Sequence, residues 1–94
     1  MSYTQDAAET FALRALGWLA TNPDLLPVFL GSTGASETDI KTHAADPVFL
    51  AAVLDFLMMD DAWVVAFCDQ AKLPYDHLLA ARAALPGGAE VNWT

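Results

Sequence analysis

Apolar residues recur along most of this chain at the three- and four-residue spacing of an α-helix, and no stretch shows the alternation of a surface strand. The longest apolar run is DPVFLAAVLDFLMMDDAWVVAFCD, residues 46–69. Asp46 and Pro47 are typical of a helix start, because Asp caps free N–H groups and Pro needs no donor at the first helical position. We therefore expect a helix from Pro47 to Met59. It would be apolar around most of its circumference, as in the central helix of a bundle.

A second helix is expected after this one, because Asp60 or Asp61 can cap it. Its inward stripe would contain Val64, Phe67, Cys68 and Ala71, with Trp63 at the flank. The pair Asp60-Asp61 also argues against a membrane span, and so does Asp55. A spanning helix needs about 20 apolar residues, and each aspartate near its centre costs about 2.5–3.5 kcal/mol. We predict no membrane segment.

The rest of the chain follows the same helical pattern. A first helix would begin near Ser2 or Thr4. Its buried stripe would contain Phe11, Ala12, Ala15, Leu16 and Leu19. A short helix would run from an Asp24 cap to about Gly31, followed by the loop GSTG. Another would run from a Ser36 cap to about residue 45.

The last helix would begin near Pro74 and end at the PGG of residues 86–88. Its inward residues would be Tyr75, Leu78, Ala81 and Leu85. These elements predict an all-α fold, a compact bundle of about five to six helices around the apolar helix Pro47 to Met59. Residues 1–94 would form one domain, with residues 86–94 as an irregular C-terminal tail.

Composition adds two constraints to this fold. The 94 residues are 55% hydrophobic, so a small domain has more apolar side chains than its core can hold, which suggests an oligomer or partner surface. The 12 acids and 4 bases give a net charge of -8. The bases lie singly, so binding to nucleic acids or anionic lipid is disfavoured. The negative charge can serve to keep the protein soluble, or it can complement the positive charge of a basic partner.

Cys68 is the only cysteine, so an internal disulfide is impossible. The N-terminus lacks the basic and apolar regions of a signal peptide, and we expect a cytoplasmic protein.

We find no set of residues with the spacing of a catalytic, cofactor or metal site. Cys68 falls on an apolar stripe, where a thiol is inert. Asp39 and His43 are four residues apart and could share a ligand, but zinc requires at least three protein ligands, so an exposed helix pair is expected. Asp55 lies in the middle of an apolar helix. We expect it either to be exposed or to pair with a base, for which Arg82 is a candidate.

Several phrases of the sequence resemble one family over nearly the whole chain. They are FALRALGWLA, DPVFLAAVLDFLMMDDAWVVAFC, the LP before the last helix and ALPGG with a terminal WT. The chain is similar to an uncharacterised family of small acidic alphaproteobacterial proteins, classed as a domain of unknown function. This resemblance implies a compact helical cytoplasmic protein, and it implies no activity and no site residues.

We therefore expect a small non-catalytic protein that acts as a protein-interaction or self-associating module, as a homodimer or with another protein. Trp63, Met58 and Met59 are the candidate interface residues, because Trp dominates binding hot spots and Met adapts to different partners. The same side chains could equally belong to the core. Two alternatives stay open: a ligand-binding or enzymatic bundle that uses Asp55 and its neighbours, and an acidic antagonist of a basic nucleic-acid-binding protein.

Overall fold

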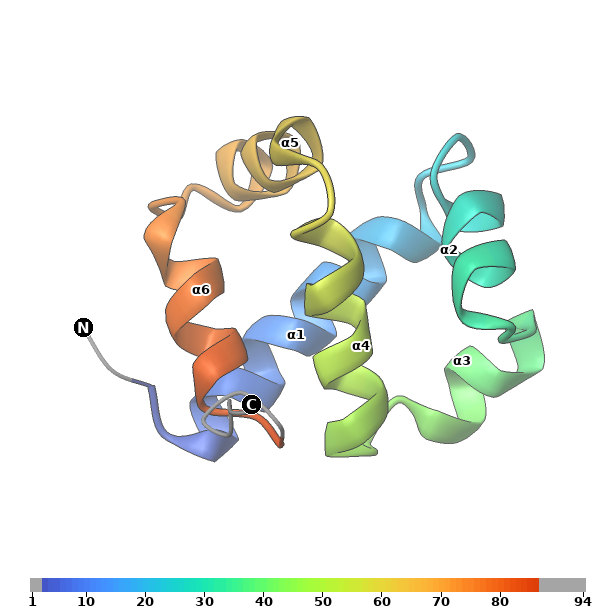
Figure 1. The fold of residues 1–94 in the computed structure, drawn as a ribbon, viewed down its shortest axis with the longest axis horizontal. Coiled ribbons are helices and arrows are strands. Elements are labelled where there is room, and N and C mark those ends of the chain that lie inside the picture. The colour runs from blue at the N-terminus through green and yellow to red at the C-terminus, as the bar shows by residue number, and fades with distance from the viewer. Residues whose placement is uncertain (1–2, 87–94) are drawn as a thin grey trace, which may run out of the picture.

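A computed structural model of the protein describes residues 3–86, and every regular element in that range is an α-helix (Figure 1). The six helices of this range are α1 (Gln5–Ala20), α2 (Leu26–Thr33), α3 (Glu37–His43), α4 (Pro47–Leu57), α5 (Asp61–Ala71) and α6 (Asp76–Ala83). The predicted all-α bundle is thus confirmed. The irregular tail predicted for residues 86–94 lies outside the described residues, apart from Pro86.

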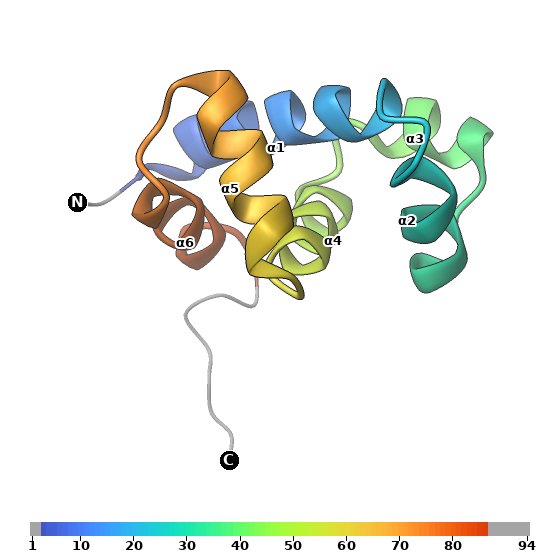
Figure 2. The same cartoon turned by 90° about the horizontal axis from the view of Figure 1, so that it is seen from above.

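The helices are arranged around the crossing of α1 with two others. α4 and α6 lie side by side, and both contact α1, which runs behind them (Figure 1). α5 lies across one end of the α4–α6 pair, while α2 and α3 gather near the C-terminal end of α1 (Figure 2). The centre of the fold is therefore the contact of α1 with α4. α4 and α6 together form a layer that packs on one side of α1.

The stripe predicted for the first helix is the buried face of α1. The buried residues of α1 are Ala8, Phe11, Ala12, Ala15, Leu16 and Leu19. Half of these are alanines, whose small side chains let α4 and α6 approach α1 closely. The buried residues of α4 are Leu50, Ala51, Val53, Leu54, Phe56 and Leu57. One connected core contains both sets, together with buried residues of α2, α5 and α6.

Most helix starts are where the capping residues predict them. The Thr4 hydroxyl accepts a hydrogen bond from the Ala7 N–H at 3.1 Å, so Thr4 is the cap of α1. Ser36 and Asp39 form a reciprocal capping box at α3. The carboxylates of Asp46 and Asp60 each accept a hydrogen bond from a backbone N–H two residues ahead, at 2.9 Å. These local contacts fix where α3, α4 and α5 begin.

The predicted bounds of α2 are wrong at both ends. The Asn22 side chain accepts hydrogen bonds from the N–H groups of Asp24 and Leu25, which forms a turn and delays the helix to Leu26. The predicted loop at Gly31 is helical as far as Thr33. The helix ends at Gly34, whose φ of 75° is the left-handed conformation that glycine adopts without strain.

The helix predicted from Pro47 to Met59 ends earlier than expected, at Leu57. Met58 and Met59 form a turn that leads into Asp60, whose backbone is extended. This extended conformation is what allows Asp60 to cap α5, so α4 cannot continue into it. As a result, the two methionines lie at the corner between α4 and α5.

Candidate interaction groove

A groove opens on the surface where the starts of α5 and α6 face the turn after α4. Its volume is about 360 Å³. The residues that line it, here called the α5–α6 groove, are Met58, Asp61, Val64, Tyr75, Asp76, Leu78 and Leu79. Five of the seven are apolar or aromatic. The groove therefore combines an apolar floor with two carboxylates.

Much of this apolar surface is exposed because of the way α6 packs. Leu78 is fully buried in the core, and Leu79 is 57% exposed. Adjacent residues of an α-helix point about 100° apart, so α6 cannot bury both leucines against α1 and α4. Tyr75 is 49% exposed and Met58 is 36% exposed. The groove thus presents side chains for which the core has no place.

Carboxylates lie at the groove for a local structural reason. Asp61 and Asp76 are the first residues of α5 and α6, where the helix dipole favours negative charge. The Tyr75 hydroxyl donates a hydrogen bond to the Asp69 carboxylate at 2.8 Å, and this bond raises the pKa of Tyr75. The tyrosine is thereby held in one orientation at the edge of the groove.

The structure separates the three residues predicted as interface anchors. Met58 lines the α5–α6 groove. Met59 is 69% exposed and lines a different depression, next to Ala52 and Phe56. Trp63 is half-buried and stacks on Phe56, with ring centroids 4.7 Å apart and planes inclined by 20°. Trp63 therefore fastens α5 to α4, and only Met58 of the three faces the groove.

The sequence pattern does not predict the positions of two groove residues, Tyr75 and Leu79. Tyr75 was expected to face inward with Leu78, but it is exposed, because its hydroxyl is bonded to Asp69 at the surface. Leu79 is not among the residues predicted to face inward or to bind a partner. The adjacent leucines at 78 and 79 were the available signal, since a short helix that packs on one side must expose one of them.

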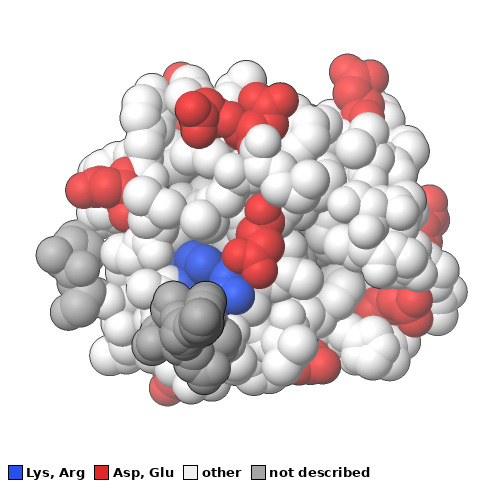
Figure 3. Space-filling view, viewed as in Figure 1, with Lys and Arg blue, Asp and Glu red and all other residues white. Residues whose placement is uncertain are grey.

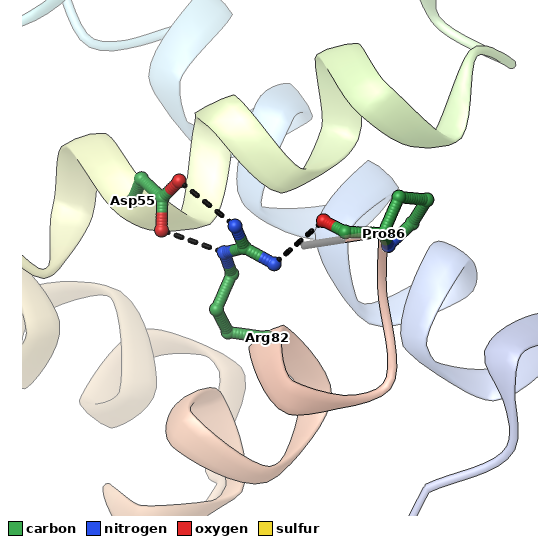
Figure 4. A network of polar contacts seen from close by, with 3 residues as sticks. All are labelled: Asp55, Arg82 and Pro86. Carbon is green, nitrogen blue, oxygen red and sulfur yellow. Dashed lines mark hydrogen bonds and ion pairs between the residues drawn. The ribbon is translucent and has the colours of Figure 1, made fainter. Parts of the chain in front are cut away.

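Asp55 and Arg82 form the ion pair that the sequence suggested (Figure 4). Arg82 Nε lies 2.6 Å from Asp55 Oδ1, and Arg82 Nη2 lies 3.2 Å from Asp55 Oδ2. Arg82 Nη1 also donates to the Pro86 carbonyl at 3.0 Å. The Arg82 side chain is 16% exposed and that of Asp55 is 55% exposed. Arg82 therefore joins α6 to α4 and to the chain after α6, and all three nitrogens of its guanidinium group take part.

A double-mutant cycle with Asp55→Ala and Arg82→Ala is expected to give a coupling energy of about 1 kcal/mol, at the upper end for a surface pair. The reason is the two-point geometry, with one partner largely covered. Urea unfolding of the four proteins measures this energy. The Arg82–Pro86 contact is lost equally with and without Asp55, so it cancels in the cycle. A coupling below about 0.3 kcal/mol, within the usual error of additivity, would show that the pair adds nothing.

The remaining candidate residues for chemistry lie apart from one another. Cys68 is fully buried, and burial raises the pKa of its thiol. Asp39 belongs to the capping box of α3, and His43 packs at 6.0 Å from the Phe49 ring. His77 Nδ1 shares a hydrogen bond with the Tyr3 hydroxyl at 2.9 Å. Each of these side chains thus has a structural partner or position.

The described residues offer neither a metal site nor a membrane span. Between residues 3 and 86, no group of three or more His, Cys, Asp or Glu side chains could hold a metal ion. No helix in that same part of the chain has the length and hydropathy to cross a bilayer.

Comparison with known proteins gives one match. A family model described as a protein of unknown function (DUF3572) matches residues 5–88. No curated protein and no solved structure matches the chain. The family match begins at the first residue of α1 and extends beyond α6, so it includes every residue of the α5–α6 groove.

Proposed function

Because the chain belongs to the DUF3572 family, whose function is unknown, we propose a function from its own surface. The protein is a non-catalytic interaction module, and the α5–α6 groove is where it docks an apolar segment of a partner protein. We also propose that the protein acts in the cytoplasm, because its single cysteine is buried and forms no internal disulfide.

The observation that carries the proposal is the exposed apolar surface of the groove. Met58 from the turn after α4 and Tyr75 and Leu79 from the start of α6 converge on one hollow, although each is at least 36% exposed. A hollow lined mainly by apolar side chains with a few polar groups is the usual form of a binding site. Methionine and tyrosine suit such a site, since one adapts its shape and the other is a frequent hot-spot residue.

The same groove gives less support to an enzymatic role. A catalytic pocket combines enclosure with several convergent polar groups whose pKa values are perturbed. In this groove the carboxylates of Asp61 and Asp76 sit at helix starts, and the Tyr75 hydroxyl is already bonded to Asp69. An open apolar hollow with a polar edge is better suited to the side chains of another protein than to holding a reacting molecule.

The test uses a photo-crosslinking amino acid placed at Leu79, with Val48 as the matched control position. Both side chains are exposed and aliphatic, at 57% and 65%, but Val48 lies on the first turn of α4, outside the groove. A partner protein is expected to crosslink from position 79 and not from position 48.

The identified partner is then produced pure, and its affinity is measured for the Leu79→Glu and Val48→Glu variants. A charge placed in the apolar groove is expected to weaken binding by more than about tenfold, as for a hot-spot residue, while Val48→Glu leaves it unchanged. Circular dichroism confirms that both variants are folded. Equal binding by Leu79→Glu and the parent protein would reject the groove as the docking site.

A further inference from the structure

The charges around the groove indicate which kind of partner segment it takes. On the assumption that the proposed function is correct, we infer that the groove binds a basic amphipathic helix. Its apolar face would lie on Met58 and Leu79, and its lysines or arginines would lie beside Asp61 and Asp76.

The groove carries negative charge that the chain does not neutralise. Asp61 and Asp76 are among its lining residues, and no lysine or arginine is. Asp60 precedes Asp61 directly, and Asp69 is bonded to Tyr75 at the groove's edge. Four of the protein's 12 acids are therefore at or next to this one surface. Opposite charge on a partner is what such a surface selects.

The four bases of the protein are engaged or placed elsewhere. Arg82 is paired with Asp55, and Arg14 donates to the Ala71 carbonyl at 3.4 Å. Lys41 lies on α3, and Lys72 follows the last residue of α5. Among residues 3–86, Asp61 and Asp76 take part in no ion pair. Residues 1–2 and 87–94 contain neither lysine nor arginine. On the face shown in Figure 3, acidic atoms are spread widely, while basic atoms appear in one place beside an acid.

A helix fits this site better than an extended peptide. A peptide in the β conformation binds by adding a strand to an exposed sheet edge, and residues 3–86 contain no strand to offer one. A polyproline segment binds in a groove lined by aromatic side chains, and Tyr75 is the one aromatic residue that lines this groove. A hollow between two helices instead receives the apolar ridge of an amphipathic helix, with residues at i, i+3 or i+4, and i+7 as anchors. The carboxylates at the rim then face the polar flank of that helix.

A second copy of this chain does not supply such a helix. Arg14 is on α1, Lys41 on α3, Lys72 at the end of α5 and Arg82 on α6, so none of its helices has two bases on one face. Each copy also carries a net charge of -8, so two copies repel. The partner segment is therefore expected to belong to a different, basic protein.

The experiment uses three synthetic peptides of about 18 residues, long enough to be helical in water. They share one leucine face, and their polar faces carry lysine, glutamine or glutamate. Titration calorimetry measures their affinities for the parent protein, for the doubly substituted Asp61→Asn/Asp76→Asn variant and for Leu79→Glu. The charge-matched control is Asp24→Asn/Glu37→Asn, which removes two exposed acids outside the groove.

The lysine peptide is expected to bind about tenfold more tightly than the glutamine peptide, as for two rim ion pairs, and the glutamate peptide most weakly. Asp61→Asn/Asp76→Asn should remove most of the difference in affinity between the lysine and glutamine peptides, without changing the affinity of the glutamine peptide. The control variant should keep that difference. Raising the salt concentration from 0.15 M to 1 M should also reduce the difference in affinity between the lysine and glutamine peptides. Leu79→Glu should abolish binding of the lysine and glutamine peptides.

Other outcomes separate the two proposals. Equal binding of the lysine and glutamine peptides, both lost in Leu79→Glu, would overturn the charge preference and leave the docking groove standing. Peptide binding that Leu79→Glu does not change would reject the groove itself. A dimer of the protein alone, seen by light scattering and dissociated by Leu79→Glu, would identify a second copy as the occupant and overturn the inference.

Discussion

Replacing Phe29 by alanine is expected to lower the free energy of unfolding by about 3–5 kcal/mol, which is a large part of the stability of a small domain. Phe29 is the buried residue of α2 and is fully enclosed. Its ring centroid lies 5.3 Å from that of Phe56 and 6.0 Å from that of Phe49, both in edge-to-face geometry. The substitution would leave a cavity between α2 and α4 and remove two aromatic contacts.

Urea unfolding followed by circular dichroism measures this loss, with Val28→Ala as the control. Val28 is the neighbouring residue on α2 and is 47% exposed, so its substitution should change stability by less than about 0.5 kcal/mol. If Phe29→Ala cost less than about 1 kcal/mol, α2 would not be held to the bundle through this ring.

The thiol of Cys68 is expected to react with a disulfide reagent at least on the order of a thousandfold more slowly in the folded protein than in urea. Cys68 is fully buried on α5, and burial raises the pKa of its thiol, so the reactive thiolate is disfavoured as well as covered. Reaction then requires that the core open. The rate of labelling at pH 8 measures this protection.

A matched control for the labelling is Val65→Cys in a Cys68→Ala background. Val65 lies on the same helix and is 38% exposed, so a thiol there should react nearly as fast as in the unfolded chain. If native Cys68 were labelled within about tenfold of the unfolded rate, α5 would be opening locally, since slow labelling is expected only when exposure requires global unfolding.

The features that could be predicted from the sequence are those fixed by near neighbours in the chain. The starts of α3, α4 and α5 are each fixed by a capping side chain. Its hydroxyl or carboxylate accepts a hydrogen bond from a backbone N–H two or three residues further along the chain. The buried stripe of α1 follows from its own periodicity. The pairing of Asp55 with Arg82 was also accessible, because a carboxylate in the middle of an apolar helix requires either water or a base.

The features that could not be predicted depend on how distant elements meet. Helical spacing correctly predicts that Leu78 is buried, but the exposure of Leu79 at the groove depends on how α6 packs against α1 and α4. The prediction that Tyr75 faces inward is wrong for a similar reason. Its hydroxyl donates a hydrogen bond to Asp69 on the preceding helix, a contact that the pattern of α6 alone does not indicate. The groove is therefore a product of tertiary packing, and no motif in the sequence indicates it.

The interface residues expected from composition illustrate the same limit. Met58, Met59 and Trp63 are close in sequence, yet they face a groove, a separate depression and the core. The turn at Met58 and Met59 directs their side chains to different sides of the corner between α4 and α5. Residue type indicates which side chains suit an interface, while the direction of the backbone decides which of them reach it.

The central position of α1 has a consequence for the synthesis of the protein. α1 is translated first, but its apolar face is covered by α4 and α6, which end at Leu57 and Ala83. At about 5–20 residues per second, a ribosome takes roughly 3–13 s to translate from Ala20 to Ala83. During that time the face of α1 that contains Phe11, Leu16 and Leu19 lacks at least one of the two helices that cover it in the folded protein. The packing of α1 is therefore completed only after α6 has been made, and a pause before the end of α6 would prolong the time for which this face is incompletely covered.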